Sequence, residues 1–584
     1  MFPHNENNGN LVEASLGNKP ADIVIKNGVL MDVYTRRMLP GRSVAVYGKW
    51  ISYVGPDAGY AVGKDTRVID AGGRVICPGF VDGHTHITSF YSIPDLLKYA
   101  IPGGTTTYIT EVDSYGFALG AKGFKMFLEQ IRNRPVKFFC TVPAMVSTSK
   151  SSGHFAVTPE EIKNLLKMED VLGLGESYWQ NIILTPDKRV FALMRETIKA
   201  GKAVEGHAAG AADKRLAAYA CAGAVSCHEA VSAEDVLNRL EMGFYAILRQ
   251  GYIRDDIGSL KSLIGKIDLR RCILCTDGVD AEYLLKFGYF NNVIQNAITM
   301  GISPIDAICM STINPAEHYH MDHLIGGIAP GRYADILILP GPDVIKPDFV
   351  ISNGSIIFEN GAVNAELKHL PYKKAMLNTV NVPLTSPKDF SVSASKCSNP
   401  GSVRTMDVQS NGLVVKEGSA NVSASDGKIF ADPQNDLLKV VFIDRATGKA
   451  KKFTGFIRGI GIKSGAIATT HSWDASSIVA VGAGDEDIAL AVNTVIGHQG
   501  GSVLASGGKV LVDIPFPVGG YIPEKPIEEV QAGMIAFQKK AEELGSKLRS
   551  VHLTLSALSS AAIPFMRITE KGYFRFREND YVGI

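Results

Sequence analysis

The chain has 584 residues, of which 46% are hydrophobic and 20% charged, and its formal net charge at pH 7 is +1. This composition is typical of a folded globular protein. A single hydrophobic core rarely organises so long a chain, and we therefore expect about two to four domains. The nearly balanced charge argues against a polyanion-binding surface, and we expect no nucleic-acid partner.

Targeting and membrane signals are missing from the sequence. The first twenty residues are polar and lack the apolar segment of a signal peptide. No run of about 18 apolar residues predicts a membrane span. Eight cysteines are dispersed along the chain, and the Cys272-Cys275 pair lies in the apolar segment RCILCTD. This placement favours packed thiols over a disulfide framework or a redox motif. We expect a cytoplasmic protein without a membrane partner.

Strand-like segments occupy the beginning of the chain. In residues 21–75, short alternating segments are separated by Asn-Gly, Gly-Lys and Gly-Gly pairs, which are typical of tight turns. Similar segments return in residues 332–363. We expect residues 1–76 and 331–385 to form the two parts of one small β-sandwich, with a linker at the end of the second range.

Between these flanks, residues 77–330 alternate short apolar strands with longer helical patterns. Several helical patterns start with Thr or Ser before acidic residues, a helix N-terminal signal. Repeated alternation over about 250 residues predicts an α/β fold, a (β/α)8 hydrolase barrel. Residues 386–584 mix strands and helices behind a stretch rich in Lys, Pro and Ser, and we expect a separate α+β domain there.

Six side chains that can bind metals follow the predicted barrel strands. His84 and His86 lie in GFVDGHTHITSF, and their spacing places them on one face of a strand. Four more stand at the ends of VLGLGE, KAVEGH, AVSCH and CILCTD, namely Glu176, His207, His228 and Asp277. Because catalytic groups of such barrels lie at the carboxyl ends of the strands, the six are expected to meet at one mouth. Converging imidazoles and carboxylates predict a metal site.

Each of these residues has another possible role when it is considered alone. The histidine pair could form a polar patch, His207 could be a hydrogen-bonded core residue, and Asp277 could cap a helix. Their shared position favours metal binding for the set. Imidazole and carboxylate together suit zinc, iron or manganese. Because six groups exceed one tetrahedral site, we expect two divalent metal ions bridged by Glu176, with Asp277 as catalytic base for a metal-bound water.

The order H-x-H, carboxylate, His, His, Asp resembles the amidohydrolase superfamily and, within it, the adenine deaminase family. The segments GLGE, EGHA, CHEA, CTDG and PGGTTTYI are similar to family motifs, as are GFIRGIGIKSGAIATT and VGAGDEDIALAVNTVI in the C-terminal domain. This resemblance implies hydrolysis of adenine to hypoxanthine and ammonia by metal-bound hydroxide at a binuclear iron or manganese site. It also implies a homo-oligomer and a catalytic proton-shuttling role for Glu229, which could instead hold a ligand histidine.

Four segments depart from the family pattern. Residues 111–116 read EVDSYG where the family usually has Pro-His-Glu, and residues 472–477 read SWDASS in place of a histidine-bearing segment. Gly278 replaces a second aspartate, and Cys227 replaces an aspartate before the histidine. Such pocket changes alter substrate choice. Two alternatives therefore stay open, namely hydrolysis of a cyclic amide, lactone or acyl compound at the same centre, and a non-catalytic assembly protein, against which the six ligands argue.

The expected partner is a small-molecule substrate, and four residues are candidate contacts to it. Arg249 ends a predicted strand in LRQG and could instead form an ion pair, while Glu111 and Asp113 lie in the changed segment EVDSYG. Trp473 is a further candidate. Trp473 and His471 could close over the barrel mouth, although we expect both to be packing residues.

Overall fold

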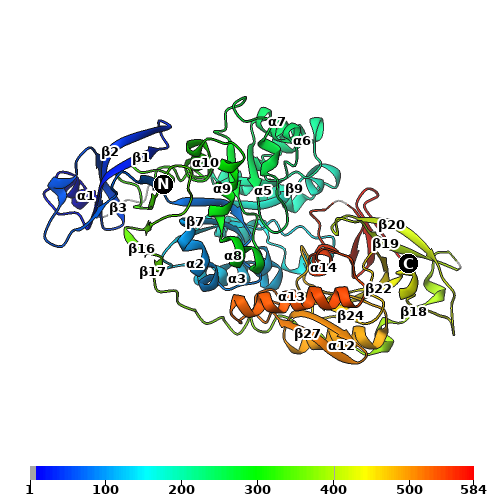
Figure 1. Cartoon of the computed structure of the whole chain (residues 1–584). Coiled ribbons are helices and arrows are strands. Elements are labelled where there is room, and N and C mark those ends of the chain that lie inside the picture. Colours follow the sequence, from blue (N-terminus) through cyan, green and yellow to red (C-terminus); the bar gives the residue numbers. More distant parts are fainter. Residues whose placement is uncertain (1–7, 400, 564) are drawn as a thin grey trace.

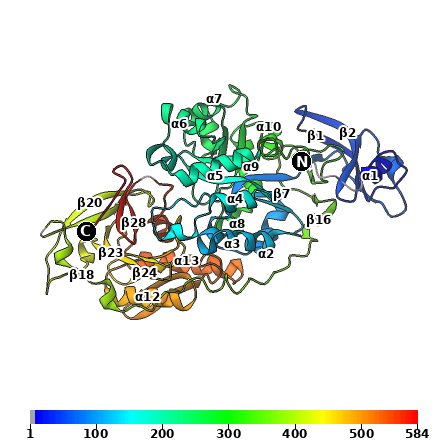
Figure 2. The ribbon, with the colours of Figure 1, turned by 180° about the vertical axis from the view of Figure 1, so that it is seen from behind.

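The structure is a computed structural model that describes residues 8–399, 401–563 and 565–584. A small β domain lies at one end of the molecule, the barrel occupies the centre, and the C-terminal domain lies at the other end (Figures 1 and 2). Helix α1 (Asn8–Ser15) packs beside the small β domain. Among the described residues, no helix combines the length and apolar character needed to cross a membrane.

The small β domain is one sheet assembled from both flanks of the barrel sequence. Its strands are β1 (Ile23–Asp32), β2 (Arg37–Tyr47), β3 (Trp50–Gly55), β4 (Arg67–Asp70), β5 (Val75–Pro78), β14 (Ile336–Leu339), β15 (Phe349–Ser352), β16 (Ser355–Glu359) and β17 (Ala362–Val363). The flanks join where β14 pairs antiparallel with β5, so that Leu337 lies opposite Cys77. Side chains from both flanks, including Ile25 and Ile338, share one buried cluster, which gives the small β domain its core. The domain boundaries drawn from the sequence remain a prediction.

The central part is the predicted (β/α)8 barrel. Its parallel strands are β6 (Phe80–Thr85), β7 (Thr105–Glu111), β8 (Lys137–Val142), β9 (Val171–Tyr178), β10 (Ala203–His207), β11 (Ser226–Cys227), β12 (Tyr245–Arg249) and β13 (Cys272–Cys275). Strands β6 to β10 form one curved sheet and β11 to β13 another. The Val225 N–H donates to the Val204 carbonyl at 3.1 Å, and the Asp277 N–H donates to the His84 carbonyl at 3.1 Å. These bonds link the two sheets at both seams and close the barrel.

Helices surround this barrel, and α4 (Pro159–Leu165) and α7 (Ala233–Glu241) begin at the Thr and Ser signals that the sequence predicts. They are α2 (Ile93–Ala100), α3 (Asp113–Ile131), α4 (Pro159–Leu165), α5 (Lys188–Lys199), α6 (Asp213–Cys221), α7 (Ala233–Glu241), α8 (Ala281–Phe287), α9 (Phe290–Thr299), α10 (Pro304–Met310) and α11 (Ile313–His318). Thr158 and Glu161 form a reciprocal capping box at α4. Ser232 caps α7 by accepting from the Asp235 N–H. These local bonds satisfy N–H groups that have no partner within the helix.

The C-terminal domain is built on a mixed sheet whose strand order is β20-β19-β23-β22-β25-β24-β26-β27. Its strands are β18 (Val392–Ser393), β19 (Ser402–Val408), β20 (Val415–Asn421), β21 (Lys428–Ile429), β22 (Leu438–Asp444), β23 (Lys452–Arg458), β24 (Ala466–Thr469), β25 (Ser477–Gly482), β26 (Gly501–Ser506), β27 (Lys509–Pro515), β28 (Arg567–Thr569), β29 (Gly572–Arg575) and β30 (Asp580–Val582). Its helices are α12 (Asp485–Gly497), α13 (Ile527–Glu543) and α14 (Val551–Ala557). Val492 of α12 packs into a core with Ala468 and Val503 of the sheet.

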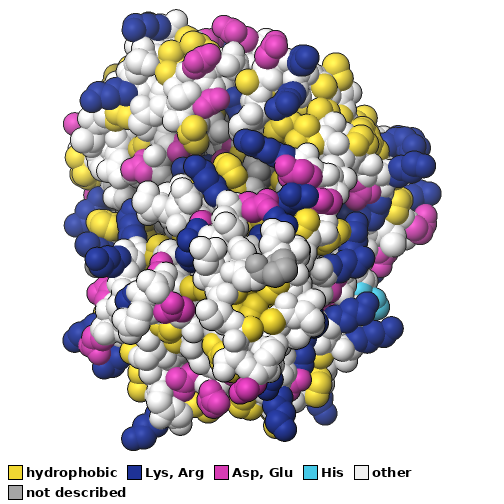
Figure 3. Space-filling model, turned by 90° about the vertical axis from the view of Figure 1, so that its right-hand side faces the viewer, with side chains coloured by type: hydrophobic (Ala, Val, Ile, Leu, Met, Phe, Trp, Pro, Cys, Tyr) yellow, Lys and Arg dark blue, Asp and Glu magenta, His cyan; other side chains and the backbone are white. Residues whose placement is uncertain are grey.

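The C-terminal domain is bonded directly to the barrel. The Ser476 N–H donates to Ser152 Oγ at 3.0 Å, and the Tyr581 hydroxyl donates to the Thr148 carbonyl at 2.6 Å. Both contacts involve the chain that follows β8, at the carboxyl ends of the barrel strands. An extended segment connects β17 to this domain along the outside of the barrel (Figure 1). On the face seen from the C-terminal side, acidic and basic side chains are interspersed (Figure 3).

Candidate metal centre

The six predicted metal ligands meet at one mouth of the barrel. His84 lies in β6, Glu176 in β9 and His207 at the end of β10. His86, His228 and Asp277 follow β6, β11 and β13 within two residues. The parallel strands therefore bring side chains from distant parts of the sequence to one place, as their positions at the strand ends predict.

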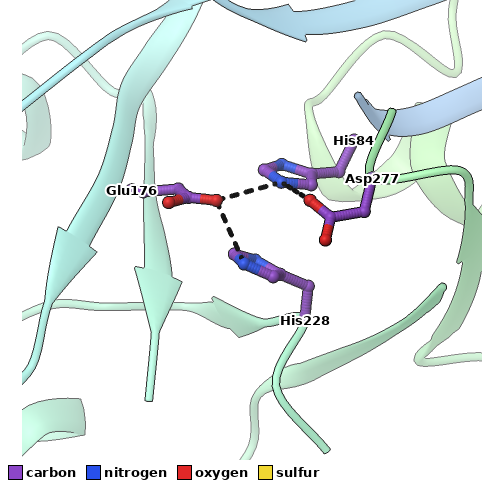
Figure 4. Close-up of side chains that lie close together, drawn as sticks. All are labelled: His84, Glu176, His228 and Asp277. Atoms are coloured by element: carbon purple, nitrogen blue, oxygen red, sulfur yellow. Dashed lines mark ion pairs between the residues drawn. The ribbon is translucent and has the colours of Figure 1, made fainter. Parts of the chain in front are cut away.

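Glu176 stands at the centre of this group. Its Oε1 atom lies 3.3 Å from His84 Nε2, 3.4 Å from His86 Nε2 and 3.1 Å from His228 Nε2. Asp277 Oδ1 lies 3.3 Å from His84 Nε2 and 3.5 Å from His86 Nε2. Figure 4 shows Glu176 and Asp277 approaching His84 from opposite sides. One carboxylate oxygen thus faces three imidazole nitrogens.

A second group of donors adjoins the first. Glu176 Oε2 lies 3.5 Å from His207 Nδ1, which is 3.0 Å from His228 Nε2. Glu229 Oε1 lies 3.6 Å from His207 Nε2 and 3.7 Å from His228 Nε2. His228 belongs to two sets of residues whose potential ligand atoms all lie within 4.8 Å of one another, one with His84, Glu176 and Asp277 and the other with His207 and Glu229. The two oxygens of Glu176 therefore face two adjoining clusters of donors.

The chemistry of these atoms fits a divalent metal. His84 Nε2 is buried and makes no hydrogen bond in the described structure, although carboxylate oxygens of Glu176 and Asp277 both lie 3.3 Å away. A buried nitrogen of this kind costs free energy unless a partner satisfies it. Imidazole nitrogens and carboxylate oxygens are ordinary ligands of zinc and other first-row metals. A cation bound between these atoms would give His84 its missing partner.

The carboxylates are held in the ionised form that metal binding requires. Burial raises the pKa of Glu176, but His228 and His207 outweigh it and hold that pKa well below its ordinary value. Burial also acts on Asp277, where the Arg249 guanidinium and His84 keep the pKa well below the usual range. For His84, burial lowers the pKa, but the two carboxylates outweigh it and raise the pKa to about 10.

The turn that carries Asp277 is fixed from below by Asp82. The Thr276 N–H and hydroxyl donate to the Asp82 carboxylate at 3.1 and 2.7 Å, and the Tyr289 hydroxyl donates to it at 2.7 Å. The backbone of Asp277 is left-handed, with φ +54°. Sequence reasoning missed Asp82, although it lies two residues before His84 and therefore on the same strand face.

Arg249 forms ion pairs within the site. Its Nη1 atom lies 2.5 Å from Glu229 Oε1 and 3.0 Å from Asp277 Oδ2, and its Nε donates to Asp256 Oδ2 at 2.6 Å. Burial raises the pKa of Glu229, but Arg249 outweighs it and lowers that pKa to about 2. Arg249 also lines the cavity above the centre, so its predicted contact with substrate remains a prediction beside the observed ion pairs.

Glu111 and Asp113 occupy different positions around this centre. The Glu111 carboxylate accepts the Glu176 N–H at 3.1 Å and lines a small adjoining pocket of about 30 Å³. Burial and the nearby Glu176 raise the pKa of Glu111 to about 7. Asp113 lines the main cavity, and its Oδ1 lies 3.5 Å from His86 Nδ1. The contacts of Glu111 and Asp113 with substrate remain predictions. The observed partner of the Glu111 carboxylate is the backbone N–H of Glu176.

The donors lie at the floor of a cavity of about 350 Å³. Both the barrel and the C-terminal domain supply its walls, and its volume falls within the range of about 300–1,000 Å³ that is typical of small-molecule sites. Trp473 and His471 line this cavity, and the contact of Trp473 with substrate remains a prediction. The C-terminal domain lies over the barrel mouth, which sequence patterns do not report. His471 also packs, since its ring stacks on Phe90 with centroids 4.6 Å apart.

Comparisons with known proteins match both halves of this architecture. Residues 75–365 match the family model described as the amidohydrolase family, and residues 413–580 match the model described as the adenine deaminase C-terminal domain. The chain is 36% identical over 570 residues to a protein from Moorella thermoacetica named adenine deaminase, a match that covers 96% of this chain and 95% of that relative. This chain belongs to the adenine deaminase family.

Other members of the adenine deaminase family match along the same length. A protein of this name from Rubrobacter xylanophilus is 33% identical over 582 residues, covering 98% of this chain and 96% of the relative. One from Cenarchaeum symbiosum is 29% identical over 588 residues, covering all of this chain and 96% of the relative. Among solved structures, β-aspartyl dipeptidase from Fervidobacterium islandicum AW-1 has a TM-score of 0.47 at 16% identity, covering 61% of this chain and 100% of that one.

The structure shows the surroundings of two residues that depart from the adenine deaminase pattern, Gly278 and Cys227. Gly278 has φ +89°, a left-handed conformation that favours glycine, and a Cβ there would lie 3.2 Å from the His86 carbonyl oxygen. Cys227 is buried, and its Sγ accepts the Glu229 N–H at 3.3 Å. Glycine therefore suits the turn that follows Asp277, and Cys227 bonds the backbone of Glu229.

Proposed function

We propose that this member of the adenine deaminase family hydrolyses adenine to hypoxanthine and ammonia. The observation that carries the proposal is the cluster of buried histidines and carboxylates at the floor of a cavity, in a chain that matches adenine deaminases along nearly its whole length. Its substrate is a small molecule, which suits the size of the cavity.

We further propose that the site binds two divalent metal ions, manganese, iron or zinc. His84, His86 and Asp277 would hold one ion, His207 and His228 the other, and Glu176 would contribute to both. The support is that Glu176 Oε1 faces His84 and His86 while Oε2 faces His207, with His228 beside Oε1 and His207. When bound, the metals would lower the pKa of a water molecule and polarise the ring carbon that carries the amino group.

Asp277 is the proposed catalytic base. In the reaction, the oxygen of water adds to the carbon that carries the amino group, and the carbon–nitrogen bond to that group then breaks. Asp277 would take a proton from the attacking water and deliver it to the departing amine, which leaves as ammonia. Arg249 holds Asp277 Oδ2 at 3.0 Å, which orients the carboxylate at the edge of the cavity.

Glu229 is the proposed proton shuttle. It lines the cavity, and Arg249 keeps its carboxylate ionised, so that it can accept the second proton of the added water from the oxygen on the ring carbon and pass it to a ring nitrogen. Its other possible role is to orient His207 as a metal ligand, since Glu229 Oε1 lies 3.6 Å from His207 Nε2.

By resemblance to the family, we also propose a homo-oligomer, which light scattering of the eluting peak in size-exclusion chromatography would test.

The decisive experiment is ammonia release from adenine by the metal-loaded protein, with Asp277→Asn as the comparison and metal content measured for both. Steady release by the native protein that the substitution abolishes is the expected result. Native protein that holds its metals but releases no ammonia would contradict the proposal. Cyclic amides, lactones and acyl compounds would then be the substrates to test at the same centre.

A further inference from the structure

Asp474 connects the barrel to the C-terminal domain at the wall of the cavity. It is the only carboxylate that the C-terminal domain supplies among the described residues that line this cavity. Its Oδ1 accepts the Tyr178 hydroxyl of β9 at 2.8 Å. Its Oδ2 accepts the Ser560 hydroxyl at 2.7 Å and the Ala561 N–H at 2.9 Å. The side chain is therefore fixed from both domains.

These bonds leave one acceptor position unused. A carboxylate offers about four lone-pair positions. Oδ2 already receives Ser560, Ala561 and a longer contact from the Ala562 N–H at 3.4 Å. Among the described residues, Tyr178 alone donates to Oδ1, and both Tyr178 and Asp474 line the cavity. An N–H group of a bound molecule can occupy the remaining position on Oδ1, and the strongest hydrogen bonds are those to ionised groups.

The backbone around Asp474 supports a role beyond packing. Asp474 has φ +56°, a left-handed conformation that aspartate adopts more readily than most residues other than glycine. Such conformations cluster at functional sites, where the surrounding structure holds them in place. Here the fully buried Arg567 donates to the Ser560 and Leu413 carbonyls, both at 3.1 Å, and fixes the loops beside Asp474.

The distance along β9 from Glu176 to Tyr178 matches the length of a bicyclic base. Tyr178 follows Glu176 by two residues, and both side chains line the cavity. A strand advances about 3.3 Å per residue, which places Tyr178 about 7 Å beyond the central metal ligand. A purine can span this interval with its amino-bearing carbon at the metal ligands and its five-membered ring at Asp474.

We propose that Asp474 is a specificity-determining residue that accepts the N–H of the five-membered ring of a purine base. The inference rests on the proposed deamination of adenine, which places the amino group at the opposite end of the base. It predicts a preference for the free base over purines substituted on that ring, including nucleosides. A substituent removes the N–H and leaves the Asp474 acceptor position without a partner.

The test compares adenine with 9-methyladenine, which carries no N–H on the five-membered ring. The substitution Asp474→Asn keeps the side-chain size. Because the Ala561 N–H can only donate, the asparagine carbonyl must face it, and the amide N–H₂ then faces Tyr178 and the cavity. We expect kcat/KM for adenine to fall by about 10- to 100-fold, and that for 9-methyladenine to change by less than about threefold.

Ser560→Ala is the matched control, because it removes a donor to Oδ2 and leaves Oδ1 in place. It should keep the native ratio of the two kcat/KM values, whatever its effect on each. Metal content and thermal unfolding would establish that both variants are folded. An equal loss for both substrates in Asp474→Asn would indicate a merely structural role and overturn the inference.

Failure of the proposed deamination and failure of the role of Asp474 give different results. Ammonia release from adenine by the native protein tests deamination by itself. Should the native protein release no ammonia, titration calorimetry of the metal-loaded protein with the same two bases would replace kinetics. Tighter binding of adenine that Asp474→Asn abolishes would support the inference without deamination. Absence of adenine binding, or a preference that persists in Asp474→Asn, would overturn it.

Discussion

The barrel and the C-terminal domain each bring an aspartate with a left-handed backbone to the same cavity, and the two carboxylates have opposite surroundings. Asp277 on the barrel side faces Arg249 and two histidines, and these charges hold its pKa well below the ordinary value. Asp474 on the C-terminal side faces neutral hydroxyl and N–H donors, and burial raises its pKa to about 6.

Two aspartates with the same left-handed backbone conformation can thus have different proposed roles, because the groups around their carboxylates differ. Surrounding charge keeps Asp277 ionised, which its proposed roles as metal ligand and proton acceptor require. Neutral donors fix the orientation of Asp474. A fixed orientation is what its proposed role in recognising the substrate requires. We therefore expect barrel substitutions to change metal content and rate, and C-terminal substitutions to change substrate binding.

The largest effect is expected for Glu176→Gln. A neutral amide in place of the carboxylate that faces both groups of histidines should reduce bound metal and lower ammonia release from adenine by about 10³-fold or more. Elemental analysis and an ammonia assay would measure both. Glu160→Gln, on the exposed surface of α4, is the control. Full metal content in Glu176→Gln would break the assignment of metal binding to the barrel side.

Arg249→Met should produce the next largest effect. The substitution leaves Glu229 and Asp277 buried without their cation, and removal of one partner from a buried ion pair costs about 3–5 kcal/mol. Thermal unfolding of chelator-treated protein should therefore shift to lower temperature. Arg249→Lys should recover only part of the loss, because a lysine cannot repeat the planar contacts. An unchanged midpoint would show that the carboxylates do not need this charge.

A smaller effect concerns acid stability on the C-terminal side. Burial lowers the pKa of His552 from 6.5 to about 4, so between these values the unfolded chain binds a proton that the folded protein does not. The free energy of unfolding should therefore decrease as pH falls from 6.5 towards 4, by about 3 kcal/mol for this residue. The adjacent His471, whose pKa is lowered well below its ordinary value, adds to the same trend.

His552→Gln removes this titration and keeps a group that can bond Ser502, whose hydroxyl lies 2.9 Å from His552 Nε2. Chemical denaturation at several pH values should show a flatter dependence in the variant than in the native protein. Identical pH profiles for the two proteins would contradict the assignment.

The smallest effect is expected for Trp473→Ala. This side chain supplies apolar surface to the C-terminal wall and lies apart from the metal ligands, so KM for adenine should rise by about tenfold with kcat nearly unchanged. Bound metal should stay at the native level. Phe191→Ala on the exposed surface of α5 is the matched control. A loss of metal, or a fall in kcat without a rise in KM, would contradict the assignment of substrate binding to the C-terminal side.

The sequence by itself determined the barrel, the small β domain and the group of metal-binding side chains. Each has a local signal, such as strand–helix alternation or a polar residue at the end of an apolar run. In parallel strands, these positions converge whatever the details of packing. Thus His84, His86 and Asp277 could be placed together from their neighbours in the chain.

Only the tertiary structure decided the other wall of the cavity. Tyr178 and Asp474 are 296 residues apart, and no local pattern reports that their side chains are bonded. Trp473 was expected to pack because its neighbours in the sequence do not reveal that the C-terminal domain covers the barrel mouth. Likewise, Arg249 became an ion-pair partner of Glu229 and Asp277 only when three strand ends met. Contacts between domains depend on how whole surfaces fit, which is a property of the folded molecule.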